Sequence, residues 1–554
     1  MRNALGVARA LAFIFVGASA SVGLFSCGRS DPGLYLIPYE SGGSAGLASA
    51  SGGSGASTGA TGGSGAVGAS GGSGPGMGGR GPASGGGAGR GVGGAAGVAS
   101  VAGAGGVMSV AGRAGAGTAG GGMSGTAGAA GGATSPPFQL LGVPLTFAPT
   151  THGFGLNVVL SAGDPQALVT YLRMEGDTDW QPVNVNPTFP ASDTAQWQLE
   201  GLLAASRYEY LVAARDADGE TNLYLGSVIT TRAPGTSFTA ALITDSHIQP
   251  REVPPGDVST TGSMEPTLAL VARDVEAAHP DFVLNLGDIL DFHPFGFNDP
   301  PPNASWARLG YLNYRRLLST SIGNAAHFGV IGNWDGESGC NTLEEIERSR
   351  SQRLIYEPNP GPETYPEGGS PNQDYYAFTW GDALFVVLNV MTYTPTCHLL
   401  NREPGLPDDW TLGSAQLDWL RSTLQNATSK WRFTFIHHTV GGKAGDDTNS
   451  AYGRGGGQAA YVGEQAIVHQ MLLDYGVQIF FYAHDHVFTD MTVDGVHYTL
   501  PGSAGAPWHF DTSETGYADY FPVSGFAKLD VSPDSVNVAF VEQGGAVIQQ
   551  ITLP

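Results

Sequence analysis

The chain has 554 residues, of which 85 are glycine and only 13% are charged, and its formal net charge is −24. Residues 1–135 hold six arginines and two acidic residues, so the remainder has 19 basic and 47 acidic residues and a net charge of −28. This excess of acidic residues argues against nucleic acid as a partner, because binding to the phosphate backbone depends on clustered Lys and Arg. The glycines keep no strict third-residue period, which excludes collagen.

The first 27 residues have the pattern of a secretory signal. Arg2 and Arg9 precede an apolar run over residues 10–25, which is shorter than a membrane span followed by a stop signal. The run ends in Leu24-Phe25-Ser26-Cys27, which is similar to the lipobox of bacterial lipoproteins, where the cysteine carries the lipid. We therefore expect an exported protein that is lipid-anchored at the bacterial cell envelope. Cleavage after Ala18-Ser19-Ala20 is the alternative, and it predicts a periplasmic or secreted protein.

Residues 28–135 are expected to form a disordered linker. Residues 41–135 contain 39 glycines interleaved with Ala and Ser, and only three charged residues, all arginine. Such a segment has too few large apolar side chains to offset the entropy lost on ordering. A flexible coil of this length spans roughly 50 to 60 Å, enough to hold a folded body clear of a membrane surface.

Residues 136–235 are predicted to form a small β-sandwich. Short alternating runs over 156–160, 167–174, 180–185 and 208–213 are separated by Gly, Pro, Asp and Asn, without a helical period. Residues 202–212 resemble a late strand of fibronectin type III domains, including a tyrosine placed to form the corner hydrogen bond. We expect a spacer or support here and assign no active residue to it.

From residue 238 onward, apolar strands each end in polar residues that can bind a metal ion. Helical segments over 265–278, 415–426 and 464–475 lie between them, which predicts a layered α/β domain. Five strands lead into such residues. The first three, over 238–244, 281–286 and 327–331, are followed in turn by Asp245-Ser246-His247, Gly287-Asp288-Ile289-Leu290-Asp291 and Gly332-Asn333-Trp334-Asp335. The last two, over 431–436 and 478–483, are followed by His437-His438 and His484-Asp485-His486.

Simple geometry suggests that these strand ends form one site. In an extended segment residues i and i+2 point to the same side, so Asp245 with His247, and His484 with His486, can each aim two ligands at one place. In α/β sheets, ligands bind where the carboxyl ends of the strands meet. Carboxylate, amide oxygen and imidazole together suit first-row divalent metals or iron.

The order of these motifs resembles the calcineurin-like metallophosphoesterase superfamily over residues 236–554, with a layout like that of the purple acid phosphatases. The resemblance implies a four-layer α/β sandwich that binds two metal ions, Fe, Mn or Zn, and hydrolyses small phosphate mono- or diesters by metal-activated hydroxide. It assigns Asp245, His247, Asp288 and His486 to the first metal and Asp288, Asn333, His437 and His484 to the second.

Two positions depart from the family pattern. Purple acid phosphatases have a tyrosine ligand after the Gly-Asp motif and no histidine in the first motif, whereas this chain has Asp291 and His247 there. The third motif of the superfamily is usually Gly-Asn-His-Asp/Glu, but here the histidine is replaced by Trp334, whose indole cannot deliver a proton near neutral pH. His438 is therefore the candidate catalytic acid.

Several alternatives stay open at this stage. Asp291 could hydrogen-bond a metal ligand or cap a turn, and Lys443 or Arg454 could meet the phosphate or belong to a solvated connection. Cys340 and Cys397 could form a disulfide bond or remain separate thiols. We expect four further histidines to be packed or surface residues, namely His293, His398, His469 and His509. The alternative function is a degenerate, non-catalytic surface binding protein whose metals only hold the fold.

Overall fold

The computed structural model describes residues 138–554 except 253, 256, 263, 292–303, 338–342, 371–373, 392–410, 439–462, 507–516 and 518. The predicted signal, the linker, Lys443, Arg454 and both Cys340 and Cys397 lie outside the described residues, as do His293, His398 and His509. All described residues belong to one compact unit. No helix within the described ranges is long and apolar enough to cross a membrane.

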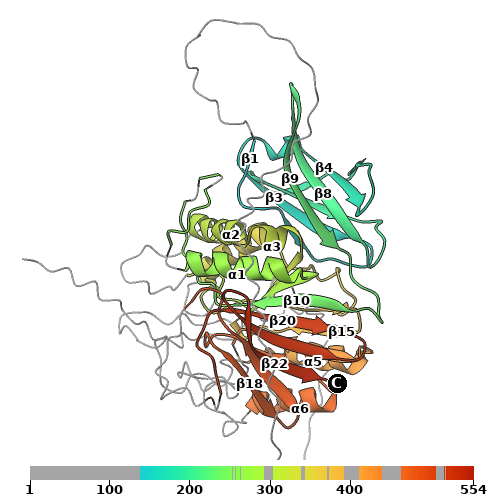
Figure 1. Cartoon of the computed structure of the whole chain (residues 1–554), viewed down its shortest axis with the longest axis vertical. Coiled ribbons are helices and arrows are strands. Elements are labelled where there is room, and N and C mark those ends of the chain that lie inside the picture. Colours follow the sequence, from blue (N-terminus) through green and yellow to red (C-terminus); the bar gives the residue numbers. More distant parts are fainter. Residues whose placement is uncertain are drawn as a thin grey trace, which may run out of the picture. The chain divides into compact units, whose positions relative to one another are not determined.

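Two large sheets form the centre of the α/β part (Figure 1). In the first, the order is β22-β21-β20-β10-β11-β12, with β10, β11 and β12 parallel and β20 to β22 antiparallel. In the second, the order is β13-β14-β15-β16-β17-β19-β18, with β15, β16, β17 and β19 parallel. The strands of the first sheet are β10 (Phe238–Ile243), β11 (Phe282–Asn285), β12 (Ala326–Gly329), β20 (Gly525–Val531), β21 (Val536–Glu542) and β22 (Ala546–Leu553). Those of the second are β13 (Gly369–Ser370), β14 (Tyr375–Trp380), β15 (Ala383–Val387), β16 (Trp431–Phe435), β17 (Ile479–Phe481), β18 (Phe488–Val493) and β19 (Val496–Pro501).

Side-chain alternation along the strands stacks the sheets between helices. Phe282 and Leu284 of β11 point into the core shared with the second sheet, whereas Val283 between them packs under the helices. Phe385 of β15 faces the same shared core, and Leu384 packs toward the helices on the far side. The result is the predicted four-layer α/β sandwich.

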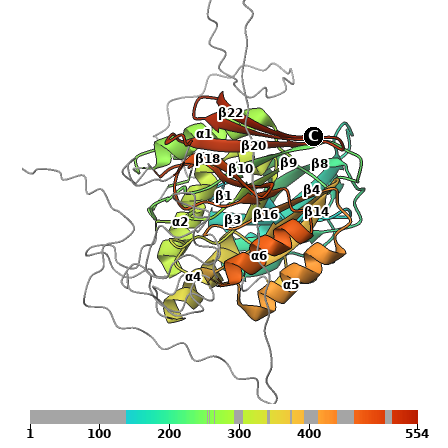
Figure 2. The same cartoon turned by 90° about the horizontal axis from the view of Figure 1, so that it is seen from below.

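The helices cover the two outer faces. They are α1 (Glu265–Ala278), α2 (Ala304–Leu318), α3 (Thr320–Gly323), α4 (Leu343–Tyr356), α5 (Gly413–Asn426) and α6 (Gly463–Asp474). Helices α1 and α2 pack on the first sheet, and α5 and α6 lie side by side against the second (Figure 2). The three helices predicted from the sequence are α1, α5 and α6, which the structure confirms to within two residues at each end.

The segment before β10 forms two facing antiparallel sheets, as the predicted sandwich requires. One has the order β2-β3-β7-β6 with β1 beside β3, and the other has the order β5-β4-β8-β9. The strands are β1 (Gln139–Leu140), β2 (Leu145–Phe147), β3 (Phe154–Ala162), β4 (Leu168–Met174), β5 (Gln181–Pro182), β6 (Thr188–Ala191), β7 (Thr194–Leu199), β8 (Arg207–Asp216) and β9 (Gly219–Ile229). The Tyr208 hydroxyl accepts a hydrogen bond from the Leu203 N–H at 3.0 Å, which is the corner hydrogen bond that the sequence predicts for this segment. The fibronectin resemblance itself stays a prediction.

The sequence does not predict how this segment joins the α/β part. Strand β2 pairs in parallel with β12, with Phe147 opposite His327, so the first sheet of the sandwich continues the first sheet of the α/β part as one 11-stranded sheet. The buried Arg315 of α2 strengthens the junction, because its guanidinium donates to the carbonyls of Val143 and Tyr356 and to the side chain of Asn157.

Candidate metal centre

Five strand ends carry the predicted ligands to one place. Strands β10, β11 and β12 are parallel neighbours in the first sheet, and β16 and β17 are parallel neighbours in the second. Within each sheet the carboxyl ends of these strands therefore lie at one edge, and the ligand clusters show that the two edges meet. The seven predicted ligand side chains are all buried, with at most 5% of each residue exposed: Asp245, His247, Asp288, Asn333, His437, His484 and His486.

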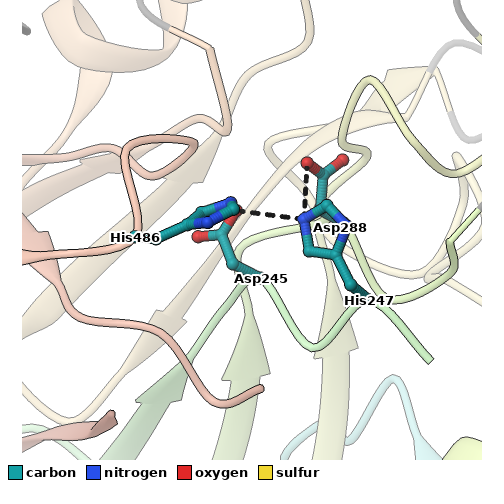
Figure 3. Close-up of side chains that lie close together, drawn as sticks. All are labelled: Asp245, His247, Asp288 and His486. Carbon is teal, nitrogen blue, oxygen red and sulfur yellow. Dashed lines mark ion pairs between the residues drawn. The ribbon is translucent and has the colours of Figure 1, made fainter. Parts of the chain in front are cut away.

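Four of these side chains form a first cluster (Figure 3). Ligand atoms of Asp245, His247, Asp288 and His486 all lie within 4.8 Å of one another. The Nε2 atom of His247 is 3.4 Å from Asp288 Oδ2, and the Nε2 atom of His486 is 3.3 Å from Asp245 Oδ1. These are the four residues that the resemblance assigned to the first metal.

A second cluster shares Asp288 with the first. Asp288, His437 and His484 bring ligand atoms within 4.8 Å of one another. The Oδ1 atom of Asn333 lies 3.1 Å from His437 Nε2 and 2.9 Å from His484 Nδ1, so the amide oxygen joins this group. Asp288 is thus the residue common to both clusters, which is the position of a bridging ligand.

The imidazole of His437 is oriented from behind. Its Nδ1 atom lies 2.8 Å from the carbonyl oxygen of Leu286, which can only accept, so Nδ1 carries a proton and donates it. The Nε2 atom then faces Asp288 Oδ2 at 3.1 Å and is the atom available to a metal. Metal-binding histidines generally donate their other N–H to a carbonyl or carboxylate in this way.

The charges of the site are balanced in a way that suits a cation. Burial by itself raises the pKa of Asp288, but the adjacent His437 and His247 outweigh burial and hold that pKa below its ordinary range. Burial lowers the pKa of His437, yet Asp288 outweighs it and raises the pKa to about 9. Protons on the imidazoles therefore balance the carboxylates, and a metal ion binding to these ligands displaces protons of this kind.

Several buried atoms of the predicted ligands also lack hydrogen bonds of good geometry, which fits the binding of metal ions. Asp245 Oδ1, His247 Nε2 and Asp288 Oδ2 are buried, and within the described part of the chain none makes a well-formed hydrogen bond. Buried polar atoms are normally hydrogen-bonded, so their convergence calls for a further partner. Carboxylate, imidazole and amide ligands of this kind can hold two ions of Fe, Mn or Zn.

The ligand residues lie on strained backbone. Asp245, His247, Asp288, His484 and His486 all have positive φ, between 45° and 77°. The left-handed region is uncommon for residues other than Gly, although Asp and His adopt it more often than most, and such strain gathers at functional sites. Positive φ thus occurs in the loops after β10, β11 and β17, which carry five of the seven predicted ligands.

Asp335, the last residue of the third motif, supports the predicted ligands from behind. Its buried carboxylate accepts backbone N–H hydrogen bonds from Gly332 at 2.8 Å, Leu290 at 3.0 Å and Asp288 at 3.1 Å. It therefore ties the loop that carries Asn333 to the loop that carries Asp288. Loop-to-loop contacts of this kind have no periodic signal in a sequence.

The remaining candidates have distinct surroundings. Trp334 is half-buried, its ring centroid lies 5.1 Å from that of His247, and its backbone N–H donates to Asp288 Oδ1 at 2.7 Å. His438 is buried, with its ring centroid 4.1 Å from that of His484. Asp291 accepts a hydrogen bond from the side chain of Gln249 at 3.1 Å and stands in neither ligand cluster. His469 is buried against Tyr498 and belongs to neither ligand cluster, as expected of a packed residue.

Comparisons with known proteins agree with this geometry. Residues 238–488 match the family model described as calcineurin-like phosphoesterase. Tartrate-resistant acid phosphatase type 5 of Mus musculus is 21% identical over 301 residues, which are 51% of this chain and 82% of the mouse protein.

Two solved structures share the fold. The structure of PhoD has a TM-score of 0.57 and 14% identity, and the match covers 76% of this chain and 91% of that one. The purple acid phosphatase from yellow lupin (Lupinus luteus) seeds has a TM-score of 0.52 and 13% identity, with 74% and 73% covered. Because the family model matches residues 238–488, which hold both clusters, this chain contains a calcineurin-like phosphoesterase domain of the kind found in metal-dependent phosphoric ester hydrolases.

Proposed function

We propose that this protein is an exported binuclear phosphoesterase that hydrolyses small phosphate mono- or diesters. The observation that carries the proposal is Asp288, whose carboxylate is common to two buried ligand clusters. One cluster could serve a structural ion, but two clusters joined by one carboxylate are the arrangement of a two-metal hydrolytic site.

In this proposal each ligand has a defined place. Asp245, His247, Asp288 and His486 hold one ion, and Asp288, Asn333, His437 and His484 hold the other. When bound, two such ions neutralise the phosphoryl oxygens, lower the pKa of a water molecule and stabilise the leaving oxygen. The chain itself holds the ligands in register, through the Leu286 carbonyl behind His437 and the Asp335 carboxylate behind Asp288.

His438 is the proposed proton donor to the leaving group. The third motif has Trp334 where a histidine is usual, and an indole N–H donates a hydrogen bond but does not release a proton near neutral pH. His438 follows a proposed ligand directly and packs against the ring of His484, so its imidazole lies beside the second cluster. Loss of a general acid lowers turnover by about 10²- to 10⁴-fold.

Export and lipid attachment are part of the proposal and rest on the sequence of residues 1–27. Mass spectrometry of the full-length protein recovered from bacterial membranes tests them directly. A lipidated N-terminal Cys27 is the expected result, with release into the soluble fraction for Cys27→Ala. If the chain is instead cleaved after Ala20 and Cys27 carries no lipid, the protein is exported without a lipid anchor.

The catalytic proposal is tested by metal content together with a panel of aryl phosphate mono- and diesters. We expect about two metal ions per chain and hydrolysis supported by Mn, Fe or Zn. Asp288→Ala should remove both ions and activity together, while Asp291→Ala, a nearby carboxylate outside both clusters, should keep them. A protein that held metal but hydrolysed no ester would instead favour the non-catalytic binding protein.

A further inference from the structure

Behind the bridging ligand lies a row of buried polar side chains that none of the roles above uses. Asn285 ends β11, Tyr314 lies on α2 and His327 lies on β12, and each is at most 1% exposed. Asn285 Nδ2 lies 2.7 Å from the Tyr314 hydroxyl oxygen, and that oxygen lies 3.0 Å from His327 Nε2. The three side chains thus form one continuous hydrogen-bonded row between β11, α2 and β12.

The row ends at the turn that carries the bridging carboxylate. Asn285 Oδ1 accepts a hydrogen bond from the Gly287 N–H at 2.8 Å. The carbonyl of the same Gly287 accepts from the Asp245 N–H at 3.0 Å, and the Asp288 carbonyl accepts from the His247 N–H at 2.9 Å. Whatever orients the Gly287 peptide therefore acts on ligands from two different strand ends.

This turn needs external support. Gly287 has φ +100°, Asp288 follows with φ +51°, and a Cβ atom at Gly287 would come within 2.6 Å of the Gly332 backbone nitrogen. The conformation is therefore open only to glycine and is packed closely against the neighbouring loop. A strained turn of this kind persists only when surrounding groups hold it.

Donor and acceptor roles along the row are fixed in one order. The Gly287 N–H can only donate, so Asn285 presents its carbonyl oxygen there and its NH₂ group to Tyr314. The Tyr314 oxygen accepts from Asn285, so its own proton goes to His327 Nε2. His327 must then be the neutral Nδ1–H tautomer, and its Nδ1 lies 3.5 Å from Glu357 Oε1.

The surroundings keep His327 in that state. Burial, followed by the positive charge of Arg315, lowers the pKa of His327 to about 3, so the ring is neutral at physiological pH. Burial also raises the pKa of the facing Glu357 well above its ordinary value. The His327 ring therefore keeps the same charge near neutral pH, and the order of donors along the row does not depend on its protonation.

We propose that Asn285, Tyr314 and His327 are positioning residues that hold the Gly287 peptide, and through it Asp288 and Asp245, in the geometry that binds metal. They touch neither substrate nor metal. The proposal rests on the metal centre described above, and it predicts that the row affects metal affinity in addition to fold stability. If Tyr314 loses its hydroxyl, the Asn285 amide is free to rotate and present the wrong group to Gly287.

The test is calorimetric titration of Mn²⁺ into the chelator-treated full chain. Tyr314→Phe should weaken Mn²⁺ binding by about tenfold, the lower end of the effect seen when groups behind metal ligands are removed. The matched control is Tyr311→Phe on the same helix. Tyr311 is equally buried, and its hydroxyl has no hydrogen-bond partner within the described residues, so its loss should change Mn²⁺ affinity by less than about twofold.

A second pair of variants keeps the test decisive where Tyr314→Phe fails to fold. His327→Leu removes the acceptor at the end of the row and should weaken Mn²⁺ binding, whereas His327→Gln keeps an acceptor near the Nε2 position and should restore most of it. The double variant Tyr314→Phe/His327→Leu should bind no more weakly than either single variant, because both break the same row.

The outcomes separate this inference from the proposed function. If the unmodified chain takes up no Mn²⁺, the proposed metal centre is wrong. If the unmodified chain binds Mn²⁺ and Tyr314→Phe binds it equally well at a lower melting temperature, the row serves packing alone and the positioning role is refuted.

Discussion

Acid should remove a specific part of this protein's stability through Glu265. This residue opens α1, is 1% exposed, and receives hydrogen bonds from Arg251 at 2.5 and 2.8 Å, from Asn313 at 2.6 Å and from Arg316 at 3.2 Å. Burial raises the pKa of Glu265, but these donors outweigh it and lower the pKa to about 2. The carboxylate therefore ties α1 to α2 and to the loop that follows β10.

The sign and size of the effect follow from this shift. Because the pKa of Glu265 in the folded state lies below its ordinary value of 4.5, its contribution is fully present above about pH 4.5 and is lost as pH falls toward 2. One pKa unit corresponds to about 1.4 kcal/mol, so the full shift is worth at most about 3.5 kcal/mol. The side chain of Arg251 is 24% exposed, so solvent screening reduces this to about 2 kcal/mol.

The assay is urea unfolding of the metal-free chain at pH 6 and pH 3, comparing the native sequence with Glu265→Gln. We expect the variant to be less stable by about 2 kcal/mol at pH 6 and by less than half of that at pH 3. Glu276→Gln is the control, because Glu276 lies exposed on the same helix and should show no such change. If the difference in free energy of unfolding between the native chain and Glu265→Gln is the same at pH 6 and pH 3, the reasoning is refuted.

Three further predictions concern the junction and the metal centre. Arg315→Met leaves several buried acceptors without a donor, so it should lower the free energy of unfolding by about 3 kcal/mol in the same urea assay. The control is Arg421→Met on the exposed face of α5, which should change the free energy of unfolding by less than about 0.5 kcal/mol. His438→Ala should lower turnover of esters with poor leaving groups by about 100-fold or more, measured as kcat, and leave esters with good leaving groups nearly unchanged. Mn²⁺ at about 100 times its Kd should stabilise the fold by about 2.7 kcal/mol, seen as a melting temperature that falls when a chelator is added.

The convergence of the seven predicted ligands could be predicted from the sequence because each lies within five residues of the end of an apolar strand. The spacing of Asp245 from His247, and of His484 from His486, is a local property of the chain, and parallel strands bring their ends together. Both features are present in one sequence alone. The structure accordingly brings all seven predicted ligands into two clusters. The extended geometry predicted for these two pairs was wrong, because all four residues lie beyond the strands and have positive φ.

The supporting residues could not be predicted in this way. Tyr314 meets Asn285 only because α2 packs across β11, and no spacing in the sequence relates a residue of that helix to the end of a strand 29 positions earlier. The pairing of β2 with β12 likewise joins segments about 180 residues apart through a single register position. Such contacts depend on how layers dock, whereas amphipathic periodicity reports only which face of each element is buried.

The backbone of the ligand loops shows why that support is needed. Five ligand residues have positive φ, and each such residue disfavours the observed conformation by about 1 kcal/mol or more. Metal binding alone is a poor source of the compensation, since the loops must already converge before both ions can share Asp288. The compensation instead comes from groups behind the ligands, namely the Asp335 carboxylate on three backbone N–H groups and Asn285 on the Gly287 N–H. The frame for the metals is therefore built by the fold, and substitutions behind the ligands should weaken metal binding even though they leave every ligand in place.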